Sequence, residues 1–279
     1  GECLLTYGGH VGSVYCAAFS PDGAQVLTAS EDGTAKLWST ESGEYIRTFG
    51  GHAGEVFSAA FSSDGAEVLT ASEDGTARLW SAASGECIRA FEGHAHIVYS
   101  AAFSPDDQLV VTASDDGTAM LWRRATGECI RTYRAHVGQV LFADFVPDGS
   151  RVVTASEDRT AKLWNTEGTE CLQTFAGHVG LVSFVSCSPD GTSILTASED
   201  GTARLWNLQS GECLRRFPRV HGRAVFSPDG AQVLTASADH TAKFWRTDSG
   251  ECLCSLVGHE DEVNSVAFLR HPRRANFLS

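Results

Sequence analysis

Apolar residues along this chain occur in short segments separated by turn residues, and the unit at residues 10–49 sets the pattern. Residues 14–20 are mainly apolar, and residues 25–30 alternate apolar and polar side chains with the two-residue period of a strand. Residues 34–38 end in a tryptophan, and residues 44–49 make a fourth short segment. No segment of useful length carries an apolar stripe with the helical period of about 3.6 residues. The unit therefore predicts four strands and no helix.

Turn residues separate the four segments. Residues 20–23 read Ser-Pro-Asp-Gly, in which proline presets φ and glycine supplies a positive φ. Residues 31–33 read Glu-Asp-Gly, and the Asp-Gly pair favours a tight hairpin. Residues 42–43, Ser-Gly, turn the chain once more. Short connections of this kind predict an antiparallel sheet of four consecutive strands.

The unit is repeated along the chain. Its terminal tryptophan recurs every 42 residues and, at the last step, after 39, at Trp38, Trp80, Trp122, Trp164, Trp206 and Trp245. A histidine recurs in the same register at His10, His52, His94, His136 and His178. Four strands in every ~40–45 residues are typical of the blades of a β-propeller.

These coordinated motifs resemble those of the WD-repeat family, and the resemblance covers essentially the whole chain. It implies an all-β propeller of seven blades with four antiparallel strands each, the seventh incomplete in this chain. A six-bladed ring with spare ends is the alternative. We expect residues 1–279 to form one propeller domain. Because residue 1 is not a methionine, we expect the chain to be a piece of a longer protein.

The resemblance also implies a structural tetrad of His, Ser, Asp and Trp, in which the histidine ties the outer loop of a blade to the aspartate of the tight turn. A His–Asp–Ser set could also indicate nucleophilic catalysis. Five copies, each ending in a tryptophan that we expect to be buried, favour a hydrogen-bonded scaffold instead. The predicted tetrads are His10, Ser30, Asp32 and Trp38; His52, Ser72, Asp74 and Trp80; His94, Ser114, Asp116 and Trp122; His136, Ser156, Asp158 and Trp164; and His178, Ser198, Asp200 and Trp206.

The sequence departs from the family pattern at two places. The aspartate that usually follows the tryptophan is replaced in every unit, by Ser39, Ser81, Arg123, Asn165, Asn207 and Arg246. Unit six has lost three residues between Phe217 and Phe226, so that its histidine, His221, is out of register. We therefore expect an altered tetrad in blade six, although Ser237, Asp239 and Trp245 are present.

The two ends of the chain bear on ring closure. Residues 2–7 match an outer strand, residues 262–269 match the first strand of a seventh blade, and residues 275–279 match the start of its second strand. A third strand is absent from the sequence. In the family the N-terminal outer strand completes the last blade; here it would lack the neighbour with which it should pair, leaving unpaired edge groups.

Family members most often bind partners on the top face, around the central channel. One row of positions there is the residue before the tetrad aspartate: Glu31, Glu73, Asp115, Glu157 and Glu199, followed by Ala238. A second row lies near the start of the inner strand: Tyr15, Phe57, Tyr99 and Leu141, with Glu55 and Ile97 as companions. These rows predict a binding face for a protein or peptide with basic and apolar residues. Duplication of a well-exposed turn would produce the same row of acids, and this interpretation stays open.

Charge and composition narrow the possible functions. A net charge of −14 argues against nucleic-acid binding, because phosphate contacts need clustered Lys and Arg. An apolar run of the ~20 residues that a membrane helix needs is absent from the sequence. Six of the nine cysteines occupy the same position of the repeated unit. Equivalent positions in successive units lie too far apart for a disulfide, so we expect these cysteines to be unpaired. We expect a cytoplasmic protein, with a nuclear location as the other possibility.

Catalysis and cofactors are not expected. A Gly-Lys pair, and with it a phosphate-binding loop, is absent from the sequence, and the stretch that begins with His259 and Glu260 lacks the second histidine of a zinc-protease motif. We predict no catalytic residues, metal, cofactor or small-molecule substrate. The leading hypothesis is a protein-interaction scaffold. The alternative is a regulatory or sensor domain of a larger signalling protein, such as an NTPase or kinase.

Overall fold

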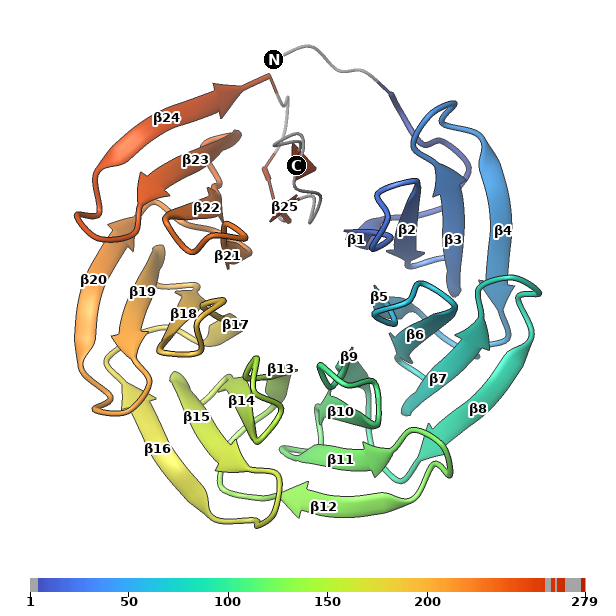
Figure 1. Ribbon diagram of the computed structural model, residues 1–279, viewed down its shortest axis with the longest axis horizontal. Coiled ribbons are helices and arrows are strands. Elements are labelled where there is room, and N and C mark those ends of the chain that lie inside the picture. The colour runs from blue at the N-terminus through green and yellow to red at the C-terminus, as the bar shows by residue number, and fades with distance from the viewer. Residues whose placement is uncertain (1–4, 259–261, 264, 269–276, 279) are drawn as a thin grey trace.

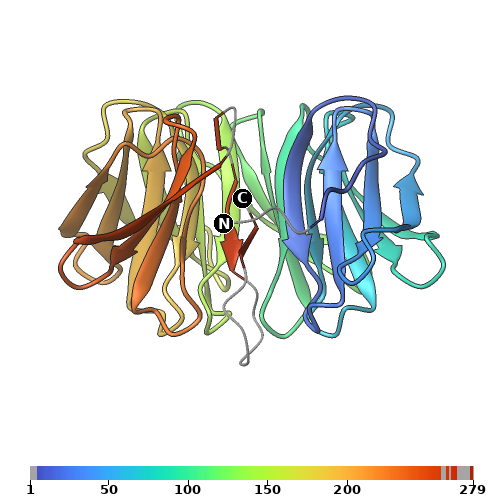
Figure 2. The ribbon, with the colours of Figure 1, turned by 90° about the horizontal axis from the view of Figure 1, so that it is seen from above.

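The computed structural model describes residues 5–258, 262–263, 265–268 and 277–278. Its strands form a ring of separate sheets around a central axis (Figure 1). Seen edge-on, the ring is a thick disc, and the turns gather on its two opposite faces (Figure 2). Every regular element is a strand in the part of the chain that the structure describes, as the sequence pattern predicts.

Six four-stranded sheets make up the ring, and each is one antiparallel blade whose strands follow in chain order. Blades one to three contain β1 (Val14–Phe19), β2 (Gln25–Ser30), β3 (Thr34–Ser39), β4 (Tyr45–Gly50); β5 (Val56–Phe61), β6 (Glu67–Ser72), β7 (Thr76–Ser81), β8 (Cys87–Glu92); and β9 (Val98–Phe103), β10 (Leu109–Ser114), β11 (Ala119–Arg123), β12 (Cys129–Tyr133). Blades four to six contain β13 (Val140–Phe145), β14 (Arg151–Ser156), β15 (Thr160–Asn165), β16 (Cys171–Ala176); β17 (Val182–Cys187), β18 (Ser193–Ser198), β19 (Thr202–Asn207), β20 (Cys213–Pro218); and β21 (Ala224–Phe226), β22 (Gln232–Ala236), β23 (Thr241–Arg246), β24 (Cys252–Val257).

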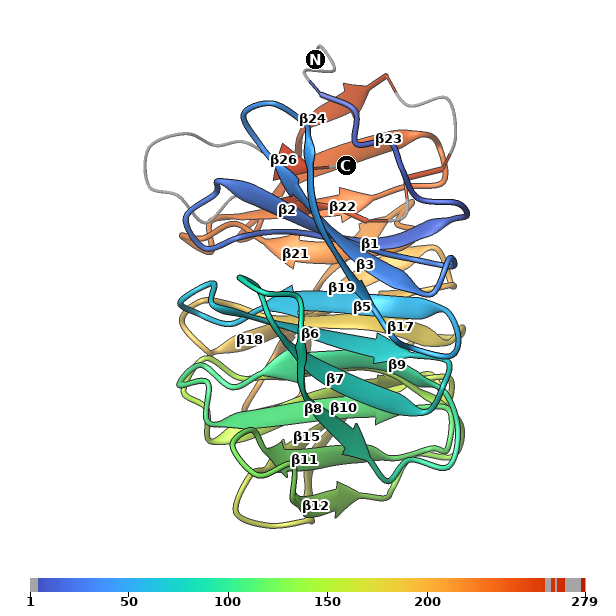
Figure 3. The same ribbon diagram turned by 90° about the vertical axis from the view of Figure 1, so that its right-hand side faces the viewer.

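The hydrophobic core lies between blades. The cluster between blades one and two joins Leu27, Leu37 and Phe49 of the first to Val56 and Trp80 of the second, and all five side chains are buried. An aromatic ring on each of the outer strands β4, β8, β12, β16 and β20 packs against the tryptophan of the next blade, as Phe49 does on Trp80 with ring centroids 6.2 Å apart. Each blade thus buries one face of its neighbour, and Figure 3 shows the blades stacked side by side.

Arginines on the outer strands form a second link between neighbouring blades. Arg47 of β4 donates to the carbonyl of Ser84 in blade two at 2.6 Å. Arg89 of β8 makes the same bond to Thr126 in blade three at 2.9 Å. Arg215 of β20 reaches Asp248 in blade six, with Nη2 2.7 Å from its carbonyl oxygen. These bonds tie the outer edge of one blade to the β3–β4-type turn of the next.

The prediction of seven blades is wrong, and the six-bladed alternative is confirmed by the six four-stranded sheets. Beyond blade six, β25 (Ala267–Phe268) and β26 (Phe277–Leu278) pair only as a two-stranded sheet, which lies between blades six and one in Figure 1. The physical reason is the sequence itself, which contains no tryptophan after Trp245 and so supplies no third strand on which a seventh blade could be built.

The predicted terminal strands are shorter than expected. Residues 5–7, the described part of the expected strand at residues 2–7, form no strand. Tyr7 nevertheless packs on Trp38 with ring centroids 6.0 Å apart, which is the contact that an outer-strand aromatic makes at the other blades. Val263 and Val266 are buried against blade six. The predicted inner strand at residues 262–269 is limited to Ala267–Phe268 among its described residues.

Candidate functional site

A chain of hydrogen bonds joins the surface loop of blade one to its buried tryptophan. His10 Nδ1 lies 2.8 Å from Asp32 Oδ2, and His10 Nε2 lies 2.7 Å from the hydroxyl of Thr28. The Trp38 indole donates to the same hydroxyl at 2.8 Å. Because an ionised carboxylate only accepts, Nδ1 carries the imidazole proton, and Nε2 accepts from Thr28. The order Asp–His–Thr–Trp thus satisfies the imidazole, the indole and the hydroxyl together.

Blades two to five repeat this network in the same register. The His–Asp distances are 2.8–2.9 Å and the His–Thr distances are 2.7–2.8 Å in all four. The tetrad serine contacts the backbone: Ser30 Oγ accepts from the amide of Asp32 at 3.2 Å. The histidines, aspartates, serines and tryptophans that were predicted to meet are therefore brought together within each blade.

The sequence interpretation missed the threonine at the centre of this network. Its five copies are Thr28, Thr70, Thr112, Thr154 and Thr196, and Thr112 and Thr154 are fully buried. The signal was present, because the threonine recurs every 42 residues in the second strand. On a strand that alternates apolar and polar residues, however, a threonine does not by itself indicate that its hydroxyl will accept a hydrogen bond from a buried tryptophan indole.

The surroundings favour the neutral form of the histidine in blades two, three and five and the ionised form of the aspartate in all five blades. Burial lowers the pKa of His52, His94 and His178, although the hydrogen bond and the charge of the aspartate act in the opposite direction. Burial by itself would raise the pKa of Asp74, but hydrogen bonds from Thr76, His52 and a backbone amide outweigh it and lower the pKa. The network is thus built for neutral pH.

Blade six has an altered network, as its shortened sequence predicted. Trp245 still donates to a threonine hydroxyl, that of Thr235, at 2.9 Å. The Lys243 ammonium takes the place of the histidine: it is buried, pairs with Asp239 and donates to Thr241 at 2.8 Å. His221 lies outside the network and donates its backbone amide to the carbonyl of Ala236. A lysine charge therefore balances the aspartate where the histidine is lost.

The aromatic row predicted on the top face lies at a β-bulge of each inner strand. The pairing of β1 with β2 skips from Val14 to Cys16, so Tyr15 is left out of the ladder, and Phe57 and Tyr99 are left out in the same way. A bulge re-aims the side chain of the extra residue. Ring centroids are 5.2 Å apart for Tyr15 and Phe57 and 5.6 Å apart for Phe57 and Tyr99. Three neighbouring blades thus form one continuous aromatic arc, and Leu141 occupies the same bulge position in blade four.

Carboxylates accompany this arc. The Tyr15 hydroxyl donates to Glu55 at 2.7 Å, and this bond, with burial and the nearby acids, raises the pKa of Tyr15 to about 12. Glu31 accepts from the amide of Ser13 at 3.0 Å, and Glu73 accepts from that of Glu55 at 3.3 Å. The predicted acids Glu31, Glu73, Glu157 and Glu199 are exposed, and Asp115 and Ile97 are partly exposed.

A shallow cleft of about 450 Å³ opens between blades three and four on the same face. Asp115 and Glu157, two of the predicted acids, line it together with Gln139 and Arg134. The Tyr99 hydroxyl lies 3.5 Å from the Gln139 side chain, so the cleft begins where the aromatic arc ends.

Three exposed valines on this face escaped the sequence interpretation. Val11, Val137 and Val179 follow the tetrad histidine in blades one, four and five, and their residues are 85%, 88% and 77% exposed. Their amides donate to the tetrad aspartates, which holds the loops in place while the side chains face solvent. Apolar side chains that rim a polar face are typical of interaction surfaces.

The Asp–His–Thr connectivity matches that of a nucleophilic relay. The hydroxyls of this relay, however, belong to residues as little exposed as Thr70 at 1%, and each is shared with an indole. A substrate has no path to them. Within the described ranges, we find no group of three or more His, Cys, Asp and Glu side chains placed to hold a metal ion. No helix in this part of the chain could span a bilayer.

The repeat units match the family described as "WD domain, G-beta repeat" at residues 1–39, 43–81, 85–123, 127–165, 169–207 and 211–246. WD repeat-containing protein 38 of Mus musculus is 55% identical over 40 residues, which are 14% of this chain and 13% of that protein. Serine-threonine kinase receptor-associated protein of Homo sapiens is 50% identical over 44 residues, 16% of this chain and 13% of that protein. Eukaryotic translation initiation factor 3 subunit I of Danio rerio is 44% identical over 46 residues, 16% of this chain and 14% of that protein. Each match thus spans about one repeat.

Proposed function

This chain belongs to the WD-repeat family, and we propose that it is a protein-interaction scaffold that binds a basic, partly apolar segment of a partner on its top face. The observation that carries the proposal is the aromatic arc of Tyr15, Phe57 and Tyr99, aligned by bulges and bordered by carboxylates. Propellers of this family are typically scaffolds rather than enzymes. The relatives named above each match about one repeat, so the partner is inferred from the face itself.

The arc supplies the apolar part of the binding energy. Aromatic side chains that are held rigid lose little entropy on binding and are enriched at interaction hot spots. Phe57 is fixed between the rings of Tyr15 and Tyr99, and Tyr15 is further held by Glu55. An apolar or aromatic side chain of the partner would stack on this arc at the mouth of the channel.

The acids supply selectivity for positive charge. Asp115 and Glu157 share the cleft next to the arc, and Glu73 lies one blade away on the exposed turn of blade two. A Lys or Arg side chain of the partner would enter this cleft and pair with the two carboxylates. Pairs of this kind contribute chiefly to selectivity and to the rate of association.

Two charge reversals test the proposal. The double variant Glu73→Lys, Asp115→Lys should weaken binding of an immobilised peptide library that contains paired Arg and Leu residues by at least about tenfold. Affinity measured by biolayer interferometry should also fall with salt for the natural chain, and this dependence should vanish in the variant.

The matched control reverses two glutamates on the opposite face. Glu86 and Glu212 follow the turns after β7 and β19 and are exposed. Glu86→Lys, Glu212→Lys changes the net charge by the same amount, so it should leave peptide affinity within about twofold if the site is local. Equal losses in the two double variants, or no loss in either, would contradict the proposal.

A further inference from the structure

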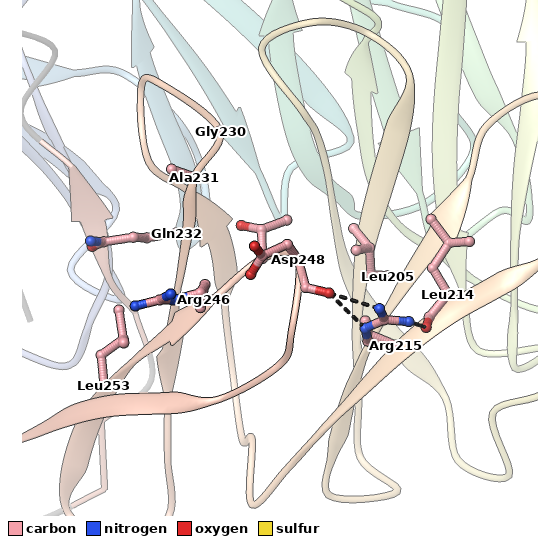
Figure 4. A pocket seen from close by; sticks show the side chains of 10 residues that line it. Leu205, Leu214, Arg215, Gly230, Ala231, Gln232, Arg246, Asp248 and Leu253 are labelled. Carbon is pink, nitrogen blue, oxygen red and sulfur yellow. Dashed lines mark hydrogen bonds between the residues drawn. The ribbon is translucent and has the colours of Figure 1, made fainter.

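A cleft on the outer rim between blades five and six is separate from the top face. It has a volume of about 640 Å³, within the range of ~300–1,000 Å³ that is usual for ligand pockets. Figure 4 shows Leu205, Leu214 and Arg215 of blade five on one side and Gln232, Arg246 and Leu253 of blade six on the other. The turns after β21 and β23 line it, so the cleft lies near the face opposite the aromatic arc.

The other blade interfaces fill the equivalent position with their own side chains. The position next after the tryptophan strand is Leu208 in blade five, where the side chain is 2% exposed and packs in the core. In blade three it is Arg124, which pairs with Glu67 of blade two. In blades one and four it is Thr40 and Thr166, whose hydroxyls donate to turn carbonyls at 2.9 Å. Each interface is therefore closed by packing or by a satisfied polar group.

Blade six breaks this rule. Its residue at the same position is Thr247, whose Oγ1 is buried and has no hydrogen-bond partner. Without a partner, this hydroxyl does not make the bond to a turn carbonyl that the threonines of blades one and four make, and an open cleft lies beside it. The repeat shows that satisfying this hydroxyl, or replacing it by leucine, is compatible with the fold.

Charge indicates the kind of ligand. Two arginines and one aspartate line the cleft, which leaves a formal +1 in a protein whose net charge is −14. The Arg215 guanidinium is held by the carbonyls of Leu214 and Asp248. Arg246 is exposed, and its side chain has no hydrogen-bond or ion-pair partner within the described residues. A free guanidinium favours a carboxylate, with which it can form two parallel hydrogen bonds.

The rest of the lining is apolar. Leu205, Leu214 and Leu253 supply the walls, and Leu253 is 39% exposed although it faces the cleft. We propose that this cleft binds an apolar group that carries one carboxylate, with the carboxylate on Arg246 and the apolar body against the three leucines. The group can belong to a free organic acid or to a peptide, and this chemistry is the same in both.

Three small molecules with one apolar body test the proposal: phenylbutyrate, phenylbutanol and phenylbutylamine. Amide chemical-shift titrations of the full chain should give saturable shifts at Ala231, Thr247 and Leu253 and none at Tyr15 or Glu31. Phenylbutyrate should bind about tenfold more tightly than the alcohol, because it gains a charge-assisted pair with Arg246. Equal affinities for the acid and the amine, or shifts spread over the whole surface, would overturn the proposal.

Variants copied from blade five make the test specific. Arg246→Asn reproduces Asn207 and should lower the affinity for phenylbutyrate about tenfold while leaving phenylbutanol within about twofold. Thr247→Leu reproduces Leu208, fills the cleft and should abolish binding of both. The matched control is Arg123→Asn, the same change in blade three, which should leave both affinities unaltered. If Thr247→Leu binds both molecules as the natural chain does, the proposed site is wrong.

A capped peptide, acetyl-Gly-Ser-Leu-Glu-Ser-Gly-amide, separates the two sources of this chemistry. Binding tighter than that of phenylbutyrate, with the same loss in Arg246→Asn, assigns the cleft to a peptide segment. Weaker binding assigns it to a free acid. Because the cleft and the aromatic arc lie on different faces, charge reversal at Glu73 and Asp115 should not change either result.

Discussion

Replacing the threonine at the centre of a blade network should destabilise the whole chain. Thr112→Val keeps the volume of the side chain and its branched shape but removes the hydroxyl. Thr112 is fully buried, receives the Trp122 indole at 2.8 Å and contacts His94 Nε2 at 2.7 Å. The variant therefore leaves one donor and one acceptor without partners inside the protein.

The magnitude follows from these two orphaned groups. Each buried polar group that loses its partner costs about 1–3 kcal/mol, so the two together should lower the free energy of unfolding by about 2–6 kcal/mol. The cost cannot be relieved by water, because Trp122 and the side chain of His94 are each 1% exposed. Guanidinium denaturation followed by tryptophan fluorescence measures the change as a shift of the midpoint at constant slope.

Thr174→Val on the exposed outer strand β16 is the matched control. Its exposed hydroxyl accepts from Lys162 at 3.1 Å and contacts the Cys171 thiol at 3.6 Å, and its loss should cost less than about 0.5 kcal/mol. A double-mutant cycle with Trp122→Phe, which removes the indole donor, should show coupling, because the two single changes orphan each other's groups. A loss below about 1 kcal/mol for Thr112→Val, or strict additivity in the cycle, would refute the reasoning.

Further predictions concern pH, the top face and the blade contacts. Burial lowers the folded-state pKa of His52, His94 and His178 below that of the unfolded chain, so the unfolded state binds more protons between the two pKa values. Stability is therefore complete above about pH 6.5 and declines as the pH falls through the folded pKa values. The lowered pKa of the tetrad aspartates adds a second decline below about pH 3.8, and a guanidinium midpoint that is flat or rises from pH 6.5 to 3 contradicts this sign. Glu55→Gln should lower the pKa of Tyr15 from about 12 toward its ordinary value, which ultraviolet titration of the tyrosines detects as one residue ionising earlier. Arg89→Met should cost about 1 kcal/mol by removing the bond to Thr126, and an unchanged midpoint would deny that bond a role. Lys243→Met should destabilise blade six by about 1 kcal/mol, since it removes the ion pair with Asp239, whose side chain is 40% exposed, and the same denaturation measures the loss.

The sequence by itself determined the repeating part of this protein. The spacing of Trp38 and its five counterparts, with the Asp-Gly turns, predicted four-stranded blades, because strand period and turn chemistry are local properties of the chain. The His–Asp contacts were predicted from the resemblance of the repeated motifs to the WD-repeat family, which implies this pairing in each copy. Blade six was recognised as different because three residues are missing before Phe226.

Only the tertiary structure decided the features that depend on which faces meet. The first such feature is the number of complete blades. The two-stranded β25–β26 sheet shows that a matching inner segment alone does not make a blade. The role of Thr112 is another, since a threonine on an alternating strand gains its partners only from the strand and loop beside it. The cleft beside Thr247 is a third such feature, because residues of two blades line it. The Thr40 hydroxyl of blade one donates to a turn carbonyl, whereas the equivalent hydroxyl of Thr247 has no partner. Such contacts join residues far apart in sequence, and no local pattern encodes them.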